Sequence, residues 1–142
     1  MIFGNLVSNM RNQSLVKHYH ILSDMYQKYQ HMWGETGNKN NFTVNIIDEK
    51  SFQIKILGTT ITVFCYYILP EEKSDILVGK LCFRNGDIRL LTLYFKTDGH
   101  LMAESWALHG DLIDTKKINQ TFDVLVEKLI ETGVFPSDYE VR

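Results

Sequence analysis

The sequence has few cysteines, little net charge and no long apolar run, and each absence excludes a class of protein. Its 142 residues include only two cysteines, Cys65 and Cys82, whereas a small secreted protein usually has a larger, even set. The net charge of -2 lacks the basic excess that favours nucleic acid or an anionic membrane as a partner. No apolar run approaches the ~20 residues of a membrane span, and the first residues lack the pattern of a signal peptide. We therefore expect a cytoplasmic protein with two free thiols, folded as one domain over residues 1–142.

Motifs for catalysis and for phosphate binding are also absent. The sequence contains no Gly-X-Ser-X-Gly nucleophile turn and neither of the common glycine-rich phosphate-binding loops. Neither cysteine follows or precedes a basic residue that would lower the pKa of its thiol. We therefore expect no catalytic residues, no metal and no cofactor, and predict that the chain is not an enzyme.

An apolar periodicity of four and three residues is present between residues 12 and 33 and predicts a long amphipathic helix. The apolar positions are Leu15, Tyr19, Leu22, Tyr26, Tyr29 and Trp33. Gly34 is well placed to end this helix, and residues 34–41 are expected to form a polar loop.

The period changes to two from Phe42 onward, which predicts strands. They are expected at 42–47, 51–57, 60–69, 76–83, 88–96 and 101–108. Asn85-Gly86 and Asp98-Gly99 are hairpin signals, and all connections are short, so neighbouring strands must be antiparallel. A second amphipathic helix is predicted over 115–132, with Asp114 as its N-cap. The predicted fold class is α+β: an N-terminal amphipathic helix, a five- to six-stranded antiparallel meander and a C-terminal helix, both helices packed on the sheet.

Histidine and acidic residues form two groups that resemble the residues of metal or acid–base sites. The first group lies opposite the apolar stripe of the long helix and comprises His20, Asp24, Gln27 and His31. Asp24 and His31 are separated by about 10 Å along a helix, so one metal ion cannot bind both. We interpret this group as a solvated face. A titrating role for His18, at the border of the stripe, is the alternative kept for this helix.

The second group follows the fifth predicted strand and comprises Asp98, His100, Glu104, His109, Asp111 and Asp114. His100 and His109 lie at opposite ends of one predicted strand, about 25–30 Å apart at 3.3 Å per residue. They cannot form one site. We interpret Asp98 and His100 as turn residues and Asp114 as a cap.

Small acidic chains without motifs often act by binding one protein, and the leading functional hypothesis follows from that. We predict a non-catalytic cytoplasmic inhibitor, of the immunity or anti-defence type, that neutralises a basic toxin or nuclease. Acidic residues near the fourth strand and in the C-terminal third would meet the partner's basic cleft. They are Glu71, Glu72, Asp75, Asp111, Asp114, Asp123, Glu127 and Glu131, with Asp138 and Glu140 beyond them. The alternative is that these residues only keep the last helix solvated.

Two further classes of function stay open. One is a dimeric secretion or assembly chaperone that uses the aromatic and methionine-rich first helix, with Tyr19, Met25, Tyr26, Tyr29, Met32 and Trp33. The other is a small-ligand or single-stranded nucleic-acid binder. A ligand cavity between sheet and helices would need polar groups such as His18 or Glu104. Nucleic acid would use strand aromatics and basic residues, namely Phe64, Tyr66, Phe83, Tyr94, Phe95, Lys80, Arg84, Arg89 and Lys96.

Overall fold

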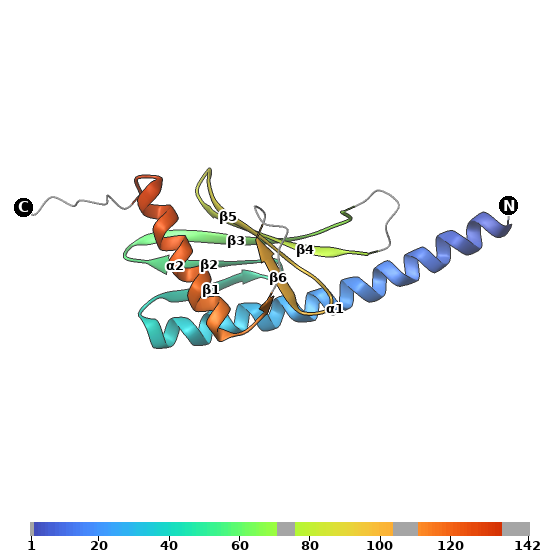
Figure 1. Cartoon of the computed structure of the whole chain (residues 1–142), viewed down its shortest axis with the longest axis horizontal. Coiled ribbons are helices and arrows are strands. Elements are labelled where there is room, and N and C mark those ends of the chain that lie inside the picture. Colours follow the sequence, from blue (N-terminus) through green and yellow to red (C-terminus); the bar gives the residue numbers. More distant parts are fainter. Residues whose placement is uncertain (1, 71–75, 104–110, 135–142) are drawn as a thin grey trace, which may run out of the picture.

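The computed structural model describes residues 2–70, 76–103 and 111–134, apart from the side chains of residues 2–9, 11, 111 and 112. The chain forms a long helix, an antiparallel sheet and a second helix (Figure 1), so the predicted α+β fold is confirmed. The helices are α1 (Ile2–Asn40) and α2 (Thr115–Glu131). The strands are β1 (Thr43–Asp48), β2 (Ser51–Ile56), β3 (Thr59–Ile68), β4 (Val78–Asn85), β5 (Ile88–Phe95), β6 (His100–Ala103) and β7 (Asp111–Leu112).

The sheet is a meander in which each strand pairs with the next in sequence, from β1 to β7, and every pairing is antiparallel. The first five predicted strands are present, and β6 covers the start of the sixth, whose residues 104–108 lie outside the described residues. The two-residue β7 is an addition that the sequence did not indicate. Gly86, at φ 57°, lies in the β4–β5 turn that Asn85-Gly86 predicts.

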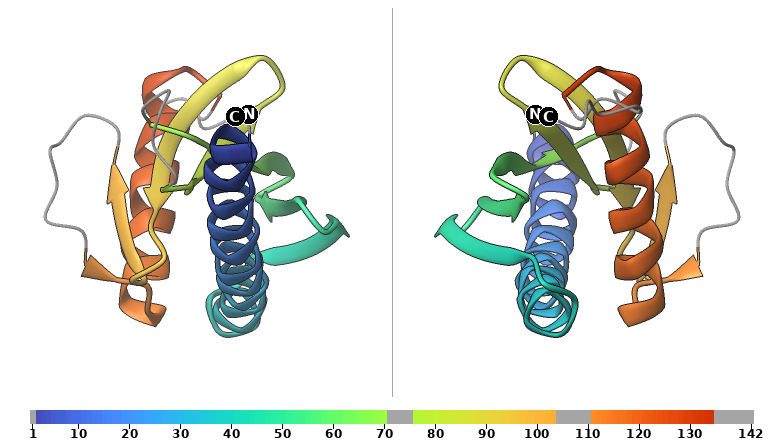
Figure 2. Two further views of the ribbon diagram at one scale, coloured as in Figure 1. Left: turned by 90° about the vertical axis from the view of Figure 1, so that its right-hand side faces the viewer. Right: turned by 90° about the vertical axis from the view of Figure 1, so that its left-hand side faces the viewer.

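Both helices pack on the same face of the sheet, and the core lies between these two layers. The two views in Figure 2 place α1 and α2 side by side under the curved sheet, and the helices also contact each other. The sheet contributes alternate residues, such as Phe52, Ile54 and Ile56 from β2. α1 contributes the predicted stripe at Leu22, Tyr26, Tyr29 and Trp33, and α2 contributes Ile118, Leu125 and Leu129.

α1 is longer at both ends than the predicted helix over 12–33. Its 39 residues measure about 58 Å at 1.5 Å per residue, whereas the longest strand, β3, has 10 residues and measures about 33 Å. The N-terminal turns of α1 therefore extend beyond the sheet (Figure 1). Neither helix has a stretch apolar enough, among the described residues, to cross a lipid bilayer.

The predicted loop over 34–41 is wrong, because tertiary packing continues the helix through Gly34 and Gly37. Phe42 folds back against the last turns, with its ring centroid 5.9 Å from that of Trp33. Gly37 is buried beneath Phe42, and a Cβ there would lie 2.7 Å from the Phe42 carbonyl oxygen. This contact outweighs the ~1 kcal/mol by which each glycine disfavours a helix. Asn41, at φ 60°, then ends α1 in the left-handed conformation.

Candidate functional site

The acidic residues of α2 form the candidate interface, and local capping positions this helix. The Oδ1 atom of Asp114 accepts a hydrogen bond of 2.8 Å from the backbone N–H of Lys117, so its predicted role as N-cap is confirmed. At the other end, Gly133 adopts φ 81° and its N–H donates to the Ile130 carbonyl. The predicted stop at residue 132 is therefore close to the observed one.

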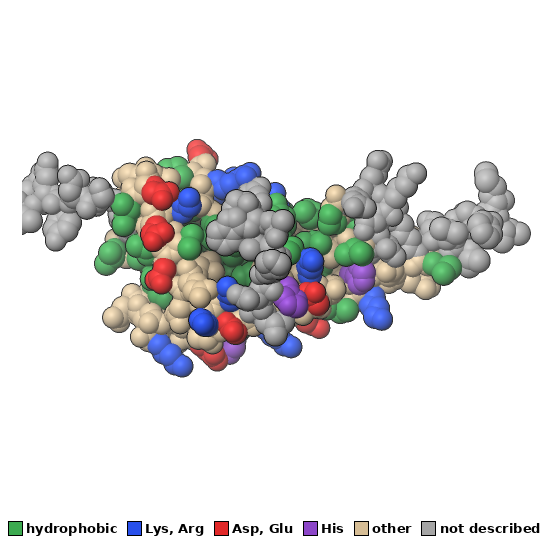
Figure 3. Space-filling model, in the orientation of Figure 1, with side chains coloured by type: hydrophobic (Ala, Val, Ile, Leu, Met, Phe, Trp, Pro, Cys, Tyr) green, Lys and Arg blue, Asp and Glu red, His purple; other side chains and the backbone are tan. Residues whose placement is uncertain are grey.

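Asp123, Glu127 and Glu131 recur every four residues along α2 and are all exposed. Figure 3 shows Asp and Glu side chains in a row over this helix. Residues four apart lie on one face of a helix, and the two ends of this row are separated by about 12 Å. Lys128 Nζ lies 3.3 Å from Glu131 Oε2 and partly balances one of the three charges. We call Asp123, Glu127 and Glu131 the acidic row.

Like charges at i and i+4 repel by about 0.2–0.5 kcal/mol per pair. The acidic row contains two such pairs, from Asp123 to Glu127 and from Glu127 to Glu131. These side chains point away from the core residues Ile118, Leu125 and Leu129 and have no role in packing α2 on the sheet. A basic surface placed against the row would remove this repulsion.

The other predicted contact residues do not join the acidic row. Asp114 lies at the start of α2, where its carboxylate caps the helix. Asp111 lies in β7, and its side chain is not described. Glu71, Glu72, Asp75, Asp138 and Glu140 lie outside the described residues. The structure therefore brings together three of the predicted contact residues in one row.

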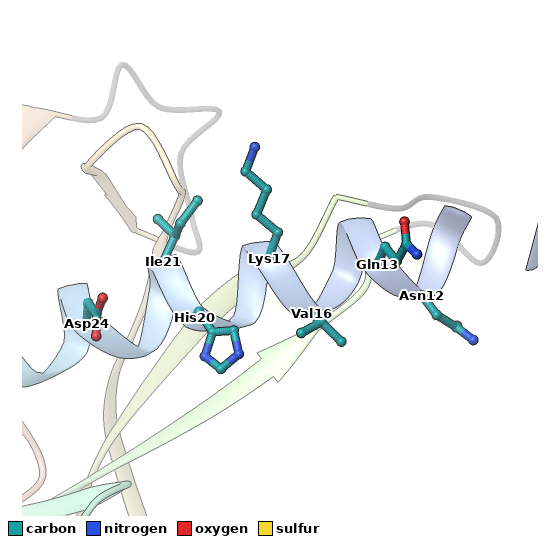
Figure 4. Close-up of a pocket in the computed structure, with 7 residues that line it drawn as sticks. All are labelled: Asn12, Gln13, Val16, Lys17, His20, Ile21 and Asp24. Carbon is teal, nitrogen blue, oxygen red and sulfur yellow. The ribbon is translucent and has the colours of Figure 1, made fainter. Parts of the chain in front are cut away.

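The polar face of α1 borders a surface hollow of about 710 Å³ that extends from Asn12 to Asp24. The described residues that line it all belong to α1. In Figure 4, Lys17 and Ile21 point to one side of the helix and Val16 and His20 to the other. His31 pairs with Glu35 through a 2.9 Å Nε2–Oε1 contact. Among the residues that the structure describes, no three His, Cys, Asp or Glu side chains are placed to hold a metal ion.

His18 and His100 have separate hydrogen-bond partners and do not share a site. The Nδ1 atom of His18 accepts a long bond, 3.4 Å, from the backbone N–H of Leu77. Asp98 Oδ1 accepts from the backbone N–H of His100 and lies 2.9 Å from His100 Nδ1, so this pair stabilises the β5–β6 turn as expected. These bonds lower the pKa of the Asp98 carboxyl. Glu104 and His109 lie outside the described residues.

The two cysteines lie on neighbouring strands but on opposite faces of the sheet. Cys65 pairs with Leu81, and Cys82 pairs with Phe64, so only Cys65 points into the core. Both thiols are free and buried. Burial raises the pKa of the Cys65 thiol to about 12, so it is not a thiolate nucleophile at neutral pH.

The aromatic and methionine residues of α1 do not form the exposed surface that a chaperone would need. Tyr26, Tyr29 and Trp33 are fully buried, and Met25 and Met32 pack against the core. The exposed apolar residues lie nearer the N-terminus of α1: Met10 is 61% exposed and Val16 is 55% exposed. Met10 precedes the predicted helix over 12–33, and Val16, which widens the predicted apolar stripe, is exposed rather than packed on the sheet.

Comparison of the chain with protein-family models, with curated proteins and with solved structures found no match.

Proposed function

We propose that this chain is a non-catalytic cytoplasmic protein that binds and inhibits a basic protein partner, such as a toxin or a nuclease. The observation that supports this function is the acidic row of α2, which is exposed, aligned and without a role in packing. A basic nucleic-acid-binding cleft is complementary to it in charge. Such complementarity speeds association and selects the partner more than it adds affinity.

The test is to replace the charges of the row without changing its shape. The variant Asp123→Asn, Glu127→Gln, Glu131→Gln removes three carboxylates from α2. A matched control, Asp24→Asn, Glu35→Gln, Glu49→Gln, removes three exposed carboxylates elsewhere. Each tagged protein captures its partner from a lysate of the native host at several salt concentrations, and mass spectrometry identifies and quantifies the partner.

We expect the wild-type chain and the control to recover the same basic protein, and the α2 variant to lose it. The purified partner's toxic or nuclease activity should fall when the wild-type chain is added in stoichiometric amount. Equal recovery by the α2 variant and the wild type, with the same salt dependence, would exclude the acidic row as the contact. A partner whose activity is unchanged in the complex would exclude inhibition.

A dimeric chaperone is the second candidate, and the exposed N-terminal part of α1 favours it. A helix with few tertiary contacts is marginal in water, and Met10 and Val16 expose apolar surface in the N-terminal half of α1. The mass in solution, measured by light scattering during gel filtration, tests this candidate. We expect a dimer that Met10→Ser, Val16→Ser dissociates and that Ile130→Ser, at an exposed site on α2, leaves intact. A wild-type monomer at all concentrations contradicts it.

A further inference from the structure

The sheet face opposite the helices presents aromatic residues on β3 and β5 and a basic residue between them on β4. Phe83 and Phe95 belong to the core, so they are not available there. Phe64 and Tyr66 alternate with the core residues Val63 and Cys65 on β3 and therefore lie on the outward face. In the register of the sheet, Tyr66 is opposite Lys80 on β4, and Lys80 is opposite Tyr94 on β5. We call this side of β3, β4 and β5 the outward face.

The two aromatic side chains of β3 are arranged as a stacking platform. The rings of Phe64 and Tyr66 are nearly parallel, at 22°, with centroids 6.4 Å apart. Tyr66 is 50% exposed, so half of this large aromatic residue is open to solvent. A hollow of about 510 Å³ borders the two rings. It is also lined by Asp48, Lys50 and Ser51 near the β1–β2 turn and, from the helix side of β3, by Tyr19, Cys65 and Tyr67. An aromatic pair next to an open hollow can receive flat, unpaired bases.

The charged residues within strands β2 to β5 have one sign, and acidic residues such as Asp87 lie in the turns. The strands β2, β3, β4 and β5 contain the basic residues Lys55, Lys80, Arg84 and Arg89, and no Asp or Glu occurs within them. Arg84 and Arg89 are directly opposite each other in the β4–β5 pair. The Nε atom of Arg84 is buried and has no hydrogen-bond partner among the described residues.

The nearest carboxylate at the hollow is that of Asp48, at the end of β1. Its Oδ1 atom accepts hydrogen bonds from the backbone N–H of Lys50, at 2.8 Å, and from the Ser51 hydroxyl, at 2.9 Å. Asp48 thus stabilises the β1–β2 turn. The basic residues of β4 and β5 lie on strands that Asp48 does not pair with.

We propose that the outward face binds single-stranded nucleic acid, with bases stacked on Phe64 and Tyr66 and phosphates beside Lys80, Arg84 and Arg89. Antiparallel sheets use this combination of surface aromatics and basic residues to bind single-stranded nucleic acid. The bases of a single strand are accessible for stacking, whereas those of a duplex are not. The acidic row of α2 lies on the helix side of the sheet. The inference therefore stands apart from the protein-binding function proposed above.

The test measures fluorescence anisotropy of labelled 20-nucleotide oligothymidine and oligouridine on addition of the full chain, over a range of salt concentrations. We expect saturable binding of single strands and weaker binding of a mixed-sequence duplex of the same length. Tyr66→Ala should weaken single-strand binding at least about fivefold, the lower end of the effect of removing one base–aromatic stack. The matched control Ile130→Ala removes an exposed apolar side chain from α2 and should bind as the wild type does.

A second pair of variants tests the phosphate contacts. Lys80→Ala should reduce the slope of log affinity against log salt by about 0.7, the value for one phosphate contact to a single strand. Lys116→Ala removes an exposed charge from α2 and should leave the slope unchanged. Circular dichroism melts verify that all four variants are folded. Absence of binding by the wild type, equal affinity for the duplex, or wild-type affinity in Tyr66→Ala would overturn the proposal.

Discussion

Gly79 and Phe95 form the contact in the sheet that is least tolerant of an added atom. They are directly opposite each other in the β4–β5 pair, and the ring of Phe95 lies over the glycine. A Cβ atom at Gly79 would overlap the Cε1 and Cζ atoms of that ring and would lie 2.7 Å from Cδ1. Phe95 is 1% exposed, so its ring cannot move into solvent. The substitution Gly79→Ala should therefore force the core to repack.

The size of the effect follows from the contact distances. Carbon atoms in van der Waals contact are about 3.5–4.0 Å apart, so the ring must shift by roughly 1 Å or more. Overpacking a well-filled core typically costs about 1–3 kcal/mol, and we expect Gly79→Ala near the upper end, about 3 kcal/mol. For a chain of this length, Tm should fall by about 6–12 °C.

A double-mutant cycle identifies the ring as the cause. Phe95→Leu removes the Cε1 and Cζ atoms, so Gly79→Ala should cost at least about 1 kcal/mol less in that background. Free energies of unfolding come from guanidinium titrations of the four proteins. The control is Gly34→Ala in α1, where an added Cβ meets nothing within 4 Å and the helix should gain about 1 kcal/mol. Equal costs of Gly79→Ala in the Phe95 and Leu backgrounds would refute this reasoning.

Three further predictions concern a turn, a cap and the response to pH. Leu57 is 89% exposed at φ 48° and precedes Gly58 at φ 80°. Because asparagine tolerates positive φ better than leucine, Leu57→Asn should raise the free energy of unfolding by about 1 kcal/mol. A lower free energy of unfolding in urea titrations would contradict this. Asp114→Ala should reduce it by about 1 kcal/mol and Asp114→Asn by much less, and equal losses would argue against capping. Burial raises the pKa of the Cys65 thiol to about 12 and raises that of the Tyr29 hydroxyl. Above pH ~9 the folded chain retains protons that the unfolded chain releases. The free energy of unfolding should therefore decline by up to ~1.4 kcal/mol per pH unit per group. An unchanged free energy of unfolding between pH 8 and 10.5 would contradict the direction of these pKa shifts.

The elements that could be predicted from the sequence are those whose signal is local. The strand order follows from short connections, and the β4–β5 turn follows from Asn85-Gly86, because both residues tolerate positive φ. The cap at Asp114 is a hydrogen bond to a residue three positions away. The stripe from Leu22 to Trp33 has the period of a helix and packs as that period requires.

The C-terminal end of α1 could not be predicted, because a tertiary contact decides where the helix ends and local helix propensity does not. Gly34 and Gly37 are stop signals by propensity alone, and only the return of Phe42 onto the last turns explains why the helix continues. The acidic row is visible in the sequence as three residues four apart. Asp114, which the sequence already predicts as the N-cap, lies at the start of α2 and stands apart from the row.

The net charge of -2 does not describe how charge is distributed on the surface, because the fold separates charges that are close to balanced along the chain. Side chains alternate between the two faces of a strand, so Lys80 and Arg84 of β4 lie on the outward face, away from the helices. The register places Arg89 of β5 opposite Arg84, on the same face. The helical period of α2 sends Asp123, Glu127 and Glu131 to the solvent on the other side, with the core between. Screening limits the reach of exposed charges to about 8–10 Å at ordinary ionic strength, whereas a sheet and a packed helix are separated by about 10 Å between backbones alone. The two proposals together predict that a substitution on one surface leaves binding at the other unchanged.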